Sequence, residues 1–343
     1  MYHFCTYFDQ HYLLRGLALY WSLEQHCPSF QLWVLCMDRS CYHILSQIQL
    51  TNIHLITLEE LEAHDKELLK SKDNRSLIEY YFTCTASLSL FILDIHPEVE
   101  RVTYLDADLF FFASPESVFK EIGNYSVAII GHRFPSHLKY MEKYGIYNVG
   151  WLSFKRDEPA LACLHGWREQ CIAWCYDRVE SGRFADQKYL DNWPDRIPSV
   201  CIVCHKGANV APWNVANYKI RKDGGRIWVD EQPLIFFHFH GLKSLNNWLY
   251  NPDLVRYGIR GNRPLRTIYA QYFATLFKVN QELLPFFRQA DLRNNIRYQS
   301  SESFTSQRVH SLRHIVRILR WRLLLCKEVL ARNYLVVING RLL

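Results

Sequence analysis

Short apolar runs alternate with helix-patterned segments over the first 130 residues, and this alternation constrains the fold more than any other feature of the sequence. Strands are expected at residues 2–7, 31–37, 53–56, 101–105 and 126–130. Helices are expected between them, at residues 11–25, 41–48, 77–93 and 118–122. Strands that alternate with helices favour a mostly parallel sheet covered by helices on both faces. We therefore predict an α/β fold that collects its ligands at the carboxyl ends of the strands.

The rest of the chain continues this pattern and then changes character. Further strands are expected at residues 147–154, 227–229 and 234–238, and further helices at 158–179, 267–279 and beyond residue 312. A length of 343 residues corresponds to about two domains. We predict a catalytic α/β domain over residues 1–250 and a helical C-terminal region over residues 251–343, with a polar linker at 294–307.

The positive charge of the chain is concentrated in its C-terminal tail. The net charge is +6, and residues 307–343 contain eight Lys and Arg side chains against the single acid Glu328. The rest of the chain is close to neutral, which argues against a protein that binds nucleic acid. In the tail, apolar residues repeat at helical spacing beside three arginines: Leu312, Ile315, Val316, Leu319 and Leu323 beside Arg313, Arg317 and Arg320. We expect a basic amphipathic helix that either contacts an anionic membrane surface or packs on the catalytic domain.

The eleven cysteines show no regular framework of spacings. Cys201-x-x-Cys204-His205 is the one metal-like cluster among them, and without a second pair it is a weak zinc signal. The first residues lack a basic segment followed by an apolar run, and no stretch reaches 18 uncharged apolar residues. The expected location is therefore the reducing cytoplasm.

The strongest chemical signal is Asp106-Ala-Asp108, which directly follows the apolar run 101–105. Two carboxylates at a strand end are costly to desolvate unless a cation or hydrogen-bond donors compensate them. Their hard oxygens suit Mg²⁺ or Mn²⁺, and such an ion could neutralise a departing diphosphate. The alternative is an exposed turn after a strand.

Three other clusters could carry polar chemistry. Asp186-Gln187 could present polar groups to a sugar, or Asp186 could cap a short helix. His238 and His240 lie two residues apart, on the same side of an expected strand, and either could bind a metal, with Lys243 adding a positive charge. In the third cluster, Asn148-Val-Gly150, the glycine allows a ligand to approach the backbone or simply serves a turn.

The order of Asp106-Ala-Asp108, Asn148-Val-Gly150, Asp186-Gln187 and His238-x-x-Gly241 resembles nucleotide-sugar glycosyltransferases of the GT-A fold, closest to family 8 and its bacterial relatives. The opening segment around Asp9, Tyr12 and Arg15 is similar to the first strand and nucleotide-binding turn of that family. The similarity covers roughly residues 2–250.

The resemblance implies a role for each of these residues. Asp106, Asp108 and His238 would hold Mn²⁺ or Mg²⁺ on the diphosphate of a nucleoside-diphosphate sugar, most simply a UDP-sugar. Asp9, Tyr12 and Arg15 would bind the nucleotide part, and Lys243 the leaving phosphate. Asn148 and Gly150 would border a sugar. The catalytic pair would be Gln187, beside the anomeric carbon of a retaining enzyme, and Asp186, which would bind donor hydroxyls.

The acceptor implied by the resemblance is a glycan or a lipid-linked sugar, as in polysaccharide biosynthesis. Two departures from the family pattern leave the stereochemistry open: residues 79–86 contain no arginine, and Lys243 follows His238 by five residues rather than six. Two other functions remain as alternatives, a nucleotidyltransferase-like enzyme and a non-catalytic sugar-binding module. The nucleotidyltransferase would need a glycine-rich phosphate loop near the N-terminus, where only Arg15-Gly16 has any similarity to one.

Overall fold

The computed structural model describes residues 1–48, 50–261, 265–286, 327 and 329–343 of the chain. These residues form two compact units, Met1–His238 and Phe239–Leu343. The division falls after His238, twelve residues before the boundary that we expected from the sequence. The tail residues around Leu312 and the polar segment 294–307 lie outside the described residues, so the membrane contact remains a prediction from sequence.

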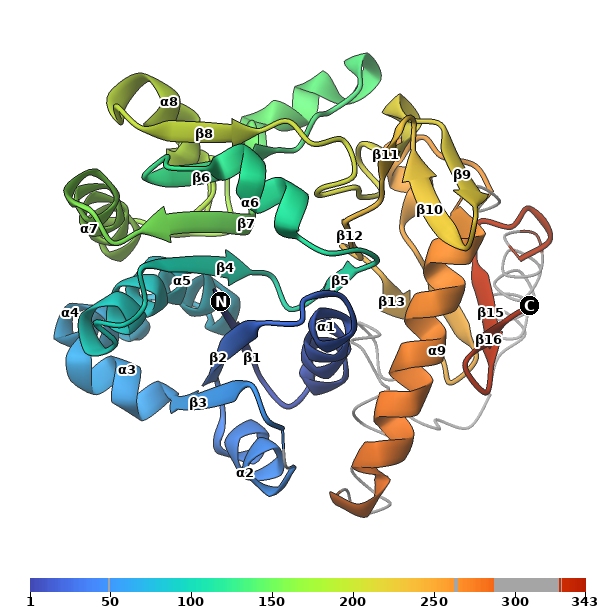
Figure 1. Ribbon diagram of the computed structural model, residues 1–343, viewed down its shortest axis with the longest axis horizontal. Coiled ribbons are helices and arrows are strands. Elements are labelled where there is room, and N and C mark those ends of the chain that lie inside the picture. The colour runs from blue at the N-terminus through green and yellow to red at the C-terminus, as the bar shows by residue number, and fades with distance from the viewer. Residues whose placement is uncertain (49, 262–264, 287–326, 328) are drawn as a thin grey trace, which may run out of the picture. The chain divides into compact units, whose positions relative to one another are not determined.

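The first unit is built on a seven-stranded sheet in the order β3-β2-β1-β4-β7-β6-β8 (Figure 1). Of these strands, only β7 runs antiparallel to its neighbours, and the other pairs are parallel. The expected fold class, a mostly parallel α/β sheet flanked by helices, is therefore confirmed. In spatial order, the strands are β3 (Ile53–Thr57), β2 (Phe30–Cys36), β1 (Tyr2–Phe8), β4 (Arg101–Leu105), β7 (Tyr147–Lys155), β6 (Val127–Gly131) and β8 (Val200–Val203).

Helices cover both faces of this sheet, and neighbouring residues of β1 show how. Phe4 packs against Phe119 of α6 (Glu116–Ile122) on one face. The next residue, Cys5, points to the opposite face, where its Sγ lies 4.0 Å from Ser89 Oγ of α5 (Leu77–Ile95). Because successive side chains of a strand alternate between faces, the sheet is buried on both sides. The other helices of the unit are α1 (Leu13–His26), α2 (Arg39–Gln47), α3 (Leu58–His64), α4 (Lys66–Ser71), α7 (Glu158–Ala173) and α8 (Trp193–Arg196).

Helix α5 is long and apolar enough to span a membrane by length and composition, with a mean hydropathy of 1.2. In the structure, 61% of that stretch is buried, and its residues contribute to the core beneath the sheet. Its apolar character is therefore explained by packing inside the first unit.

Two short strand groups complete the first unit. Strand β5 (Leu109–Phe111) follows Asp108 directly and pairs antiparallel with β12 (Phe236–His238). The second group is a small antiparallel sheet formed by β9 (Ile220–Asp223), β10 (Arg226–Val229) and β11 (Gln232–Pro233).

In its described residues, the second unit combines a long helix with an antiparallel sheet that we did not expect from the sequence, and the tail helix that we expected lies outside these residues. The helix is α9 (Arg266–Leu283). The four strands of the sheet are β13 (Lys243–Ser244), β14 (Leu249–Asn251), β15 (Leu335–Ile338) and β16 (Arg341–Leu342).

Helix α7 ends at Ala173, six residues before the helix end that we expected from the sequence. The next residue, Trp174, has an extended backbone. At this helix end, the Arg75 guanidinium donates hydrogen bonds to the carbonyls of Cys171 and Ile172 in the last turn. These carbonyls have no partner within the helix, and a cationic side chain satisfies them.

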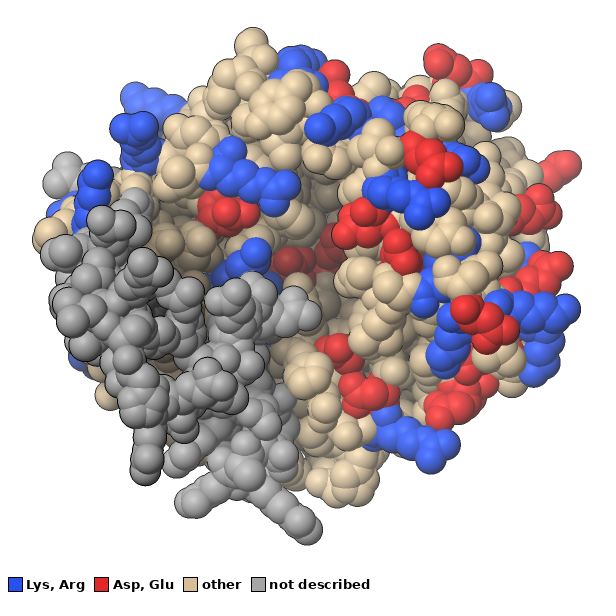
Figure 2. All heavy atoms as spheres, turned by 180° about the vertical axis from the view of Figure 1, so that it is seen from behind, with Lys and Arg blue, Asp and Glu red and all other residues tan. Residues whose placement is uncertain are grey.

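Charged side chains of both signs are intermixed over the face of the molecule shown in Figure 2.

The carboxylate of Asp65 joins three helices on one face of the sheet. It caps α4 by accepting the Leu68 N–H, and it also accepts from Ser87 of α5 and from the guanidinium of Arg168 of α7 at 2.5 and 2.6 Å. Burial raises the pKa of this carboxyl, but these hydrogen bonds outweigh that effect and hold the pKa below its ordinary value.

Replacement of Asp65 by Asn is expected to lower the free energy of unfolding by about 2 kcal/mol near neutral pH, because it removes the buried counter-charge of the mostly buried Arg168 guanidinium and leaves only the exposed Glu67 carboxylate. A depressed carboxyl pKa contributes stability that is present above the ordinary value and is lost as pH falls through the folded value. The difference between wild type and Asp65→Asn should therefore shrink in strong acid. Urea unfolding followed over pH measures both effects. Arg39→Gln, which removes the exposed pair with Glu59, is the control and should change stability by less than about 0.5 kcal/mol.

Candidate functional site

The two aspartates of the Asp-x-Asp sequence lie in the tight turn between β4 and β5. The Asp106 N–H donates to the Gly150 carbonyl at 3.1 Å, and the Asp106 carbonyl accepts from the Leu109 N–H at 3.1 Å. These bonds turn the chain at the carboxyl end of β4. The turn places both carboxylates at the sheet edge where α/β proteins bind ligands.

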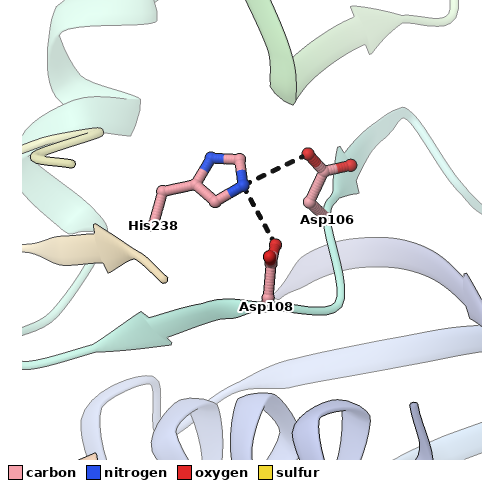
Figure 3. Close-up of side chains that lie close together, drawn as sticks. All are labelled: Asp106, Asp108 and His238. Carbon is pink, nitrogen blue, oxygen red and sulfur yellow. Dashed lines mark ion pairs between the residues drawn. The ribbon is translucent and has the colours of Figure 1, made fainter. Parts of the chain in front are cut away.

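His238 reaches these aspartates through the pairing of β12 with β5. The register places His238 opposite Leu109, the residue that follows Asp108. His238 Nε2 lies 2.9 Å from Asp108 Oδ1 and 3.6 Å from Asp106 Oδ2 (Figure 3). Each residue offers one ligand atom, and these three atoms lie within 4.8 Å of one another. His240, the alternative ligand suggested by the sequence, belongs to the second unit.

The charges in this cluster favour a bound cation. Burial and the nearby Asp108 carboxylate raise the pKa of Asp106 to about 6, although the charge of His238 opposes that shift. Burial lowers the pKa of His238, but the two aspartates outweigh burial and raise it overall. Without a metal, the imidazole proton compensates the carboxylates. Two carboxylate oxygens and one imidazole nitrogen are a donor set that a divalent cation could take over from that proton.

Among the described residues, this is the only group of three or more His, Cys, Asp or Glu side chains placed to hold a metal ion. The Cys201-x-x-Cys204-His205 sequence forms no such group there. Instead, Glu121 accepts hydrogen bonds from the backbone N–H groups of Cys204 and His205.

The turn after β1 and the start of α1 place the Arg15 guanidinium and the Tyr12 ring at the same edge of the sheet. Asp9 Oδ1 accepts the N–H groups of His11 and Tyr12, which fixes the chain just before α1. Arg15, in the first turn of α1, is only 8% exposed, and its guanidinium lies 3.8 Å from Asp108 Oδ2 and 5.0 Å from the Tyr12 ring centroid. The structure therefore brings Arg15 together with the metal-site carboxylates.

The Gln187 side-chain amide is held in place at both of its ends. Its Nε2 donates to the Tyr144 carbonyl at 3.0 Å, and its Oε1 accepts from Asn148 Nδ2 at 3.2 Å and from the Val149 N–H at 3.4 Å. The structure thus joins Gln187 to Asn148, two candidate residues 39 positions apart in the sequence.

Gly150 lies where a side chain would collide with the site. A Cβ atom there would come within 2.6 Å of Asn148 Oδ1 and 3.0 Å of the His238 ring. The glycine is therefore required by the close packing of the metal-site histidine against β7.

Asp186 is buried, with 4% of its surface exposed. Its Oδ2 accepts a hydrogen bond from the Thr85 hydroxyl at 3.0 Å, and its backbone carbonyl accepts the Trp167 indole N–H. Burial, with a smaller contribution from the charge of Asp106, raises the pKa of this carboxyl to about 7.

The remaining predicted site residue, Lys243, begins β13 of the second unit and is exposed. Sequence reasoning missed Tyr104, whose hydroxyl donates to Asp106 Oδ1 at 2.9 Å. The i, i+2 spacing of Tyr104 and Asp106 at the end of a strand is the signal that could have indicated this contact.

No known protein-family model matches the chain. It is 31% identical over 289 residues to the uncharacterized protein YfnD of Bacillus subtilis, which covers 83% of this chain and 92% of YfnD. It is 34% identical over 251 residues to the uncharacterized protein YfnF of the same organism, which covers 71% of this chain and 82% of YfnF. The chain belongs to the family of these two proteins.

Among solved structures, the chain is similar to the galactosyltransferase LgtC in complex with donor and acceptor sugar analogs. That match has 17% identity and a TM-score of 0.48, and it covers 70% of this chain and 87% of LgtC. The chain is also similar to mouse xyloside xylosyltransferase 1, with 14% identity and a TM-score of 0.47. This match covers 70% of this chain and 98% of the xylosyltransferase.

Gly150→Ala is expected to weaken Mn²⁺ binding by about tenfold or more, because the new methyl group must displace Asn148 or the His238 ring. Isothermal titration calorimetry measures this affinity directly. The matched control is Gly166→Ala within α7, where a Cβ meets no atom within 4 Å. This control should bind Mn²⁺ as wild type does. Equal affinities in all three proteins would contradict the packing argument.

Cation affinity should decrease as pH falls through about 6, the pKa of Asp106 without metal. Below that pH, a proton occupies the carboxylate that would otherwise bind the ion. Electron paramagnetic resonance of unbound Mn²⁺ between about pH 8 and pH 5 measures the loss. Affinity that stays constant over this range would remove Asp106 from the ligand set.

Proposed function

We propose that the chain is a metal-dependent glycosyltransferase that transfers a sugar from a nucleoside-diphosphate sugar to an acceptor. The observation that carries the proposal is the convergence of Asp106, Asp108 and His238 at the carboxyl edge of a mostly parallel sheet. The order of these residues with Asn148, Gly150, Asp186 and Gln187 in the sequence supports the same family, GT-A glycosyltransferases close to family 8.

Asp106, Asp108 and His238 would hold Mn²⁺ or Mg²⁺. Such an ion supplies positive charge for the diphosphate as it leaves. The imidazole ligand favours Mn²⁺ over a purely oxygen-ligated Mg²⁺ site.

In the first unit, the positive charge of Arg15 is well placed to help neutralise the negative charge of a bound diphosphate. Its guanidinium beside Asp108 is nearly buried, and a charge in such a place acts more strongly than one in water. We propose that it binds the diphosphate next to the ion. Asp9 and Tyr12 border the same edge and would bind the nucleotide, which we take to be UDP.

Gln187 is our proposal for the residue beside the reacting carbon. Its amide is fixed by Tyr144 and Asn148, so it can orient the sugar and stabilise positive charge without reorganising. An amide is a weak nucleophile, which favours front-face retention without a covalent intermediate. Proton NMR of the fresh product gives the anomeric configuration, and inversion would discard this mechanism.

A nucleotidyltransferase would require a flexible glycine-rich phosphate loop at the first turn. Gly16, the glycine that suggested such a loop, lies inside α1, where a Cβ would come within 2.3 Å of the Phe8 ring. Its missing side chain therefore serves the packing of α1 on β1. This observation disfavours the nucleotidyltransferase.

The acceptor in our proposal is a glycan or lipid-linked sugar, with Lys243 assisting at the leaving phosphate. We also propose a cytoplasmic location, with contact between the basic tail and an anionic membrane surface. This contact is supported by the tail sequence alone, and co-sedimentation of the full chain with anionic vesicles at low and high salt tests it. Pelleting that is insensitive to salt would argue against an electrostatic attachment.

Asp106→Asn and Asp108→Asn should each reduce turnover by about a hundredfold or more, because an amide keeps the shape of the carboxylate and loses its charge. The assay measures release of UDP from a panel of UDP-sugars with Mn²⁺, and it includes the exposed Asp223→Asn as a control that should stay fully active. Full activity of both site variants without added metal would refute the metal-dependent mechanism. Tight binding of UDP-sugars without any release across a broad acceptor panel would favour the sugar-binding module.

A further inference from the structure

His132 lies at the end of a series of hydrogen bonds that leads to Gln187. Strand β6 ends at Gly131, which pairs with Tyr147 of β7. The next residue, His132, therefore lies beside the start of β7, and its backbone N–H donates to the Ile146 carbonyl at 2.9 Å. The same carbonyl lies 3.3 Å from His132 Nδ1. One carbonyl thus faces both the backbone and the ring of this histidine.

Packing holds the His132 ring in this position. The residue is 6% exposed, and its ring stacks on Phe134 with a centroid distance of 4.8 Å and an interplanar angle of 9°. The Trp213 ring meets it edge to face at 5.2 Å. Its other nitrogen, Nε2, lies 3.4 Å from Asn148 Nδ2. Both nitrogens of this buried imidazole therefore face polar groups, so the position of its proton matters.

Two backbone groups decide which way the Gln187 amide points. The Val149 N–H can only donate a hydrogen bond, and the Tyr144 carbonyl can only accept one. The Gln187 amide meets both groups, at 3.4 Å from the Val149 nitrogen and 3.0 Å from the Tyr144 oxygen. Its oxygen must therefore face Val149, and its nitrogen must face Tyr144. The two ends of this amide cannot be exchanged.

The fixed Gln187 amide in turn decides the orientation of Asn148. The Asn148 amide meets Gln187 Oε1 at 3.2 Å, and this oxygen requires a donor opposite it. The atom at that position must therefore be Asn148 Nδ2, which carries two protons. One proton is directed to Gln187 and the other to His132 Nε2. His132 Nε2 must then be an unprotonated acceptor.

The proton of His132 therefore belongs on Nδ1, where it faces the Ile146 carbonyl. A proton on Nε2, in the other tautomer or in the imidazolium, would face a donor. Rotation of the Asn148 amide does not relieve this conflict, because it would turn the amide oxygen toward Gln187 Oε1. One arrangement of protons satisfies every contact in the series, and in it the imidazole is neutral.

The orientation of the Asn148 amide depends on these contacts, because its oxygen adds nothing to them. Among the described residues, Asn148 Oδ1 has no hydrogen-bond partner. The two contacts of Nδ2, to His132 and Gln187, therefore set the orientation of the amide. Without the acceptor on His132, a buried N–H would be left unsatisfied, and the amide would be free to turn away from Gln187.

We infer that His132 is a positioning residue for Gln187. It is held as a neutral imidazole with its proton on Nδ1, and its Nε2 accepts from Asn148 and so fixes the amide that supports Gln187 Oε1. The inference deepens the proposed function and rests on it for the role of Gln187 beside the reacting carbon. Its claim about the proton on His132 stands on the hydrogen bonds alone.

Nuclear magnetic resonance of the full chain with ¹⁵N-labelled histidine rings tests the position of the proton. The chain contains 15 histidines, so the His132 signals are identified by their loss in His132→Gln. At about pH 8, above the ordinary pKa of histidine, the wild type should show a proton on Nδ1 and none on Nε2. A free neutral histidine favours the opposite tautomer. A proton on Nε2 of His132 overturns the inference.

Asn148→Asp tests the link between the amide and the ring. A carboxylate has no proton to donate, so it cannot satisfy an unprotonated His132 Nε2. In this variant, the proton should move to Nε2, or a second proton should bind there. A folded Asn148→Asp that keeps the proton of His132 on Nδ1 alone overturns the inference.

Two substitutions at His132 separate the acceptor from the packing, because both remove the ring. Glutamine can place an oxygen where Nε2 lies, whereas asparagine is too short to reach Asn148. His132→Gln should therefore keep most of the turnover. His132→Asn should lower kcat by about tenfold with little change in KM for the donor, because Gln187 acts at the reacting carbon. Equal turnover in the two variants overturns the positioning role.

His54→Asn is the matched control for these two variants. His54 also stacks on an aromatic ring, that of Trp33 at 4.8 Å, and also contacts a side-chain amide, that of Gln31. It belongs to β3, at the far edge of the sheet from β6. His54→Asn should keep the turnover of the wild type and leave the His132 signals unchanged.

Failure of the proposed function has a different signature. In that case, the wild type releases no UDP from any UDP-sugar, whereas the ring nitrogens still report the proton on His132 and its response to Asn148→Asp. Failure of the inference alone leaves the release of UDP by the wild type intact.

Discussion

The antiparallel pairing of β5 with β12 is the interaction on which the site depends. It joins Leu109 to His238 across 129 positions of sequence and thereby brings an imidazole to the two carboxylates of one turn. The pair also closes the core on that side, where Phe111, Phe236 and Trp151 pack together. Because the same residues serve the core and the ligand geometry, the position of His238 is fixed by packing as well as by its charged neighbours.

Much of the first unit could be predicted from the sequence, because its helices and strands have recognisable local patterns of apolar residues. The apolar runs of β1, β2, β4 and β6 and the long apolar pattern of α5 lie where the periodicity placed them. Helices α3 and α4 were missed, although a capping signal was present: Thr57 and Glu60 form a reciprocal capping box, and Asp65 caps the next helix. Strand β8 was missed because its four residues lie in a loop-rich region, and only its pairing with β6 makes it a strand.

The identity of the site residues could be predicted from the sequence, but the contacts between them could not. Asp106, Asp108 and His238 carry recognisable chemistry at recognisable positions, and their order in the chain indicates a family. The link between Gln187 and Asn148 depends on how two distant loops approach each other. In the sequence, Tyr104 is expected to be a core residue, because a tyrosine in an apolar run is usually explained by its ring. Only the structure shows that its hydroxyl donates to Asp106 Oδ1.

The Tyr104 hydroxyl shows how the core and the candidate site constrain each other. A buried tyrosine hydroxyl needs a partner, and the partner of Tyr104 is the Asp106 carboxylate. Removal of that carboxylate would therefore leave a buried hydroxyl unsatisfied, and removal of the hydroxyl would release the carboxylate. A substitution at either residue thus changes both the packing of β4 and the geometry of the candidate site.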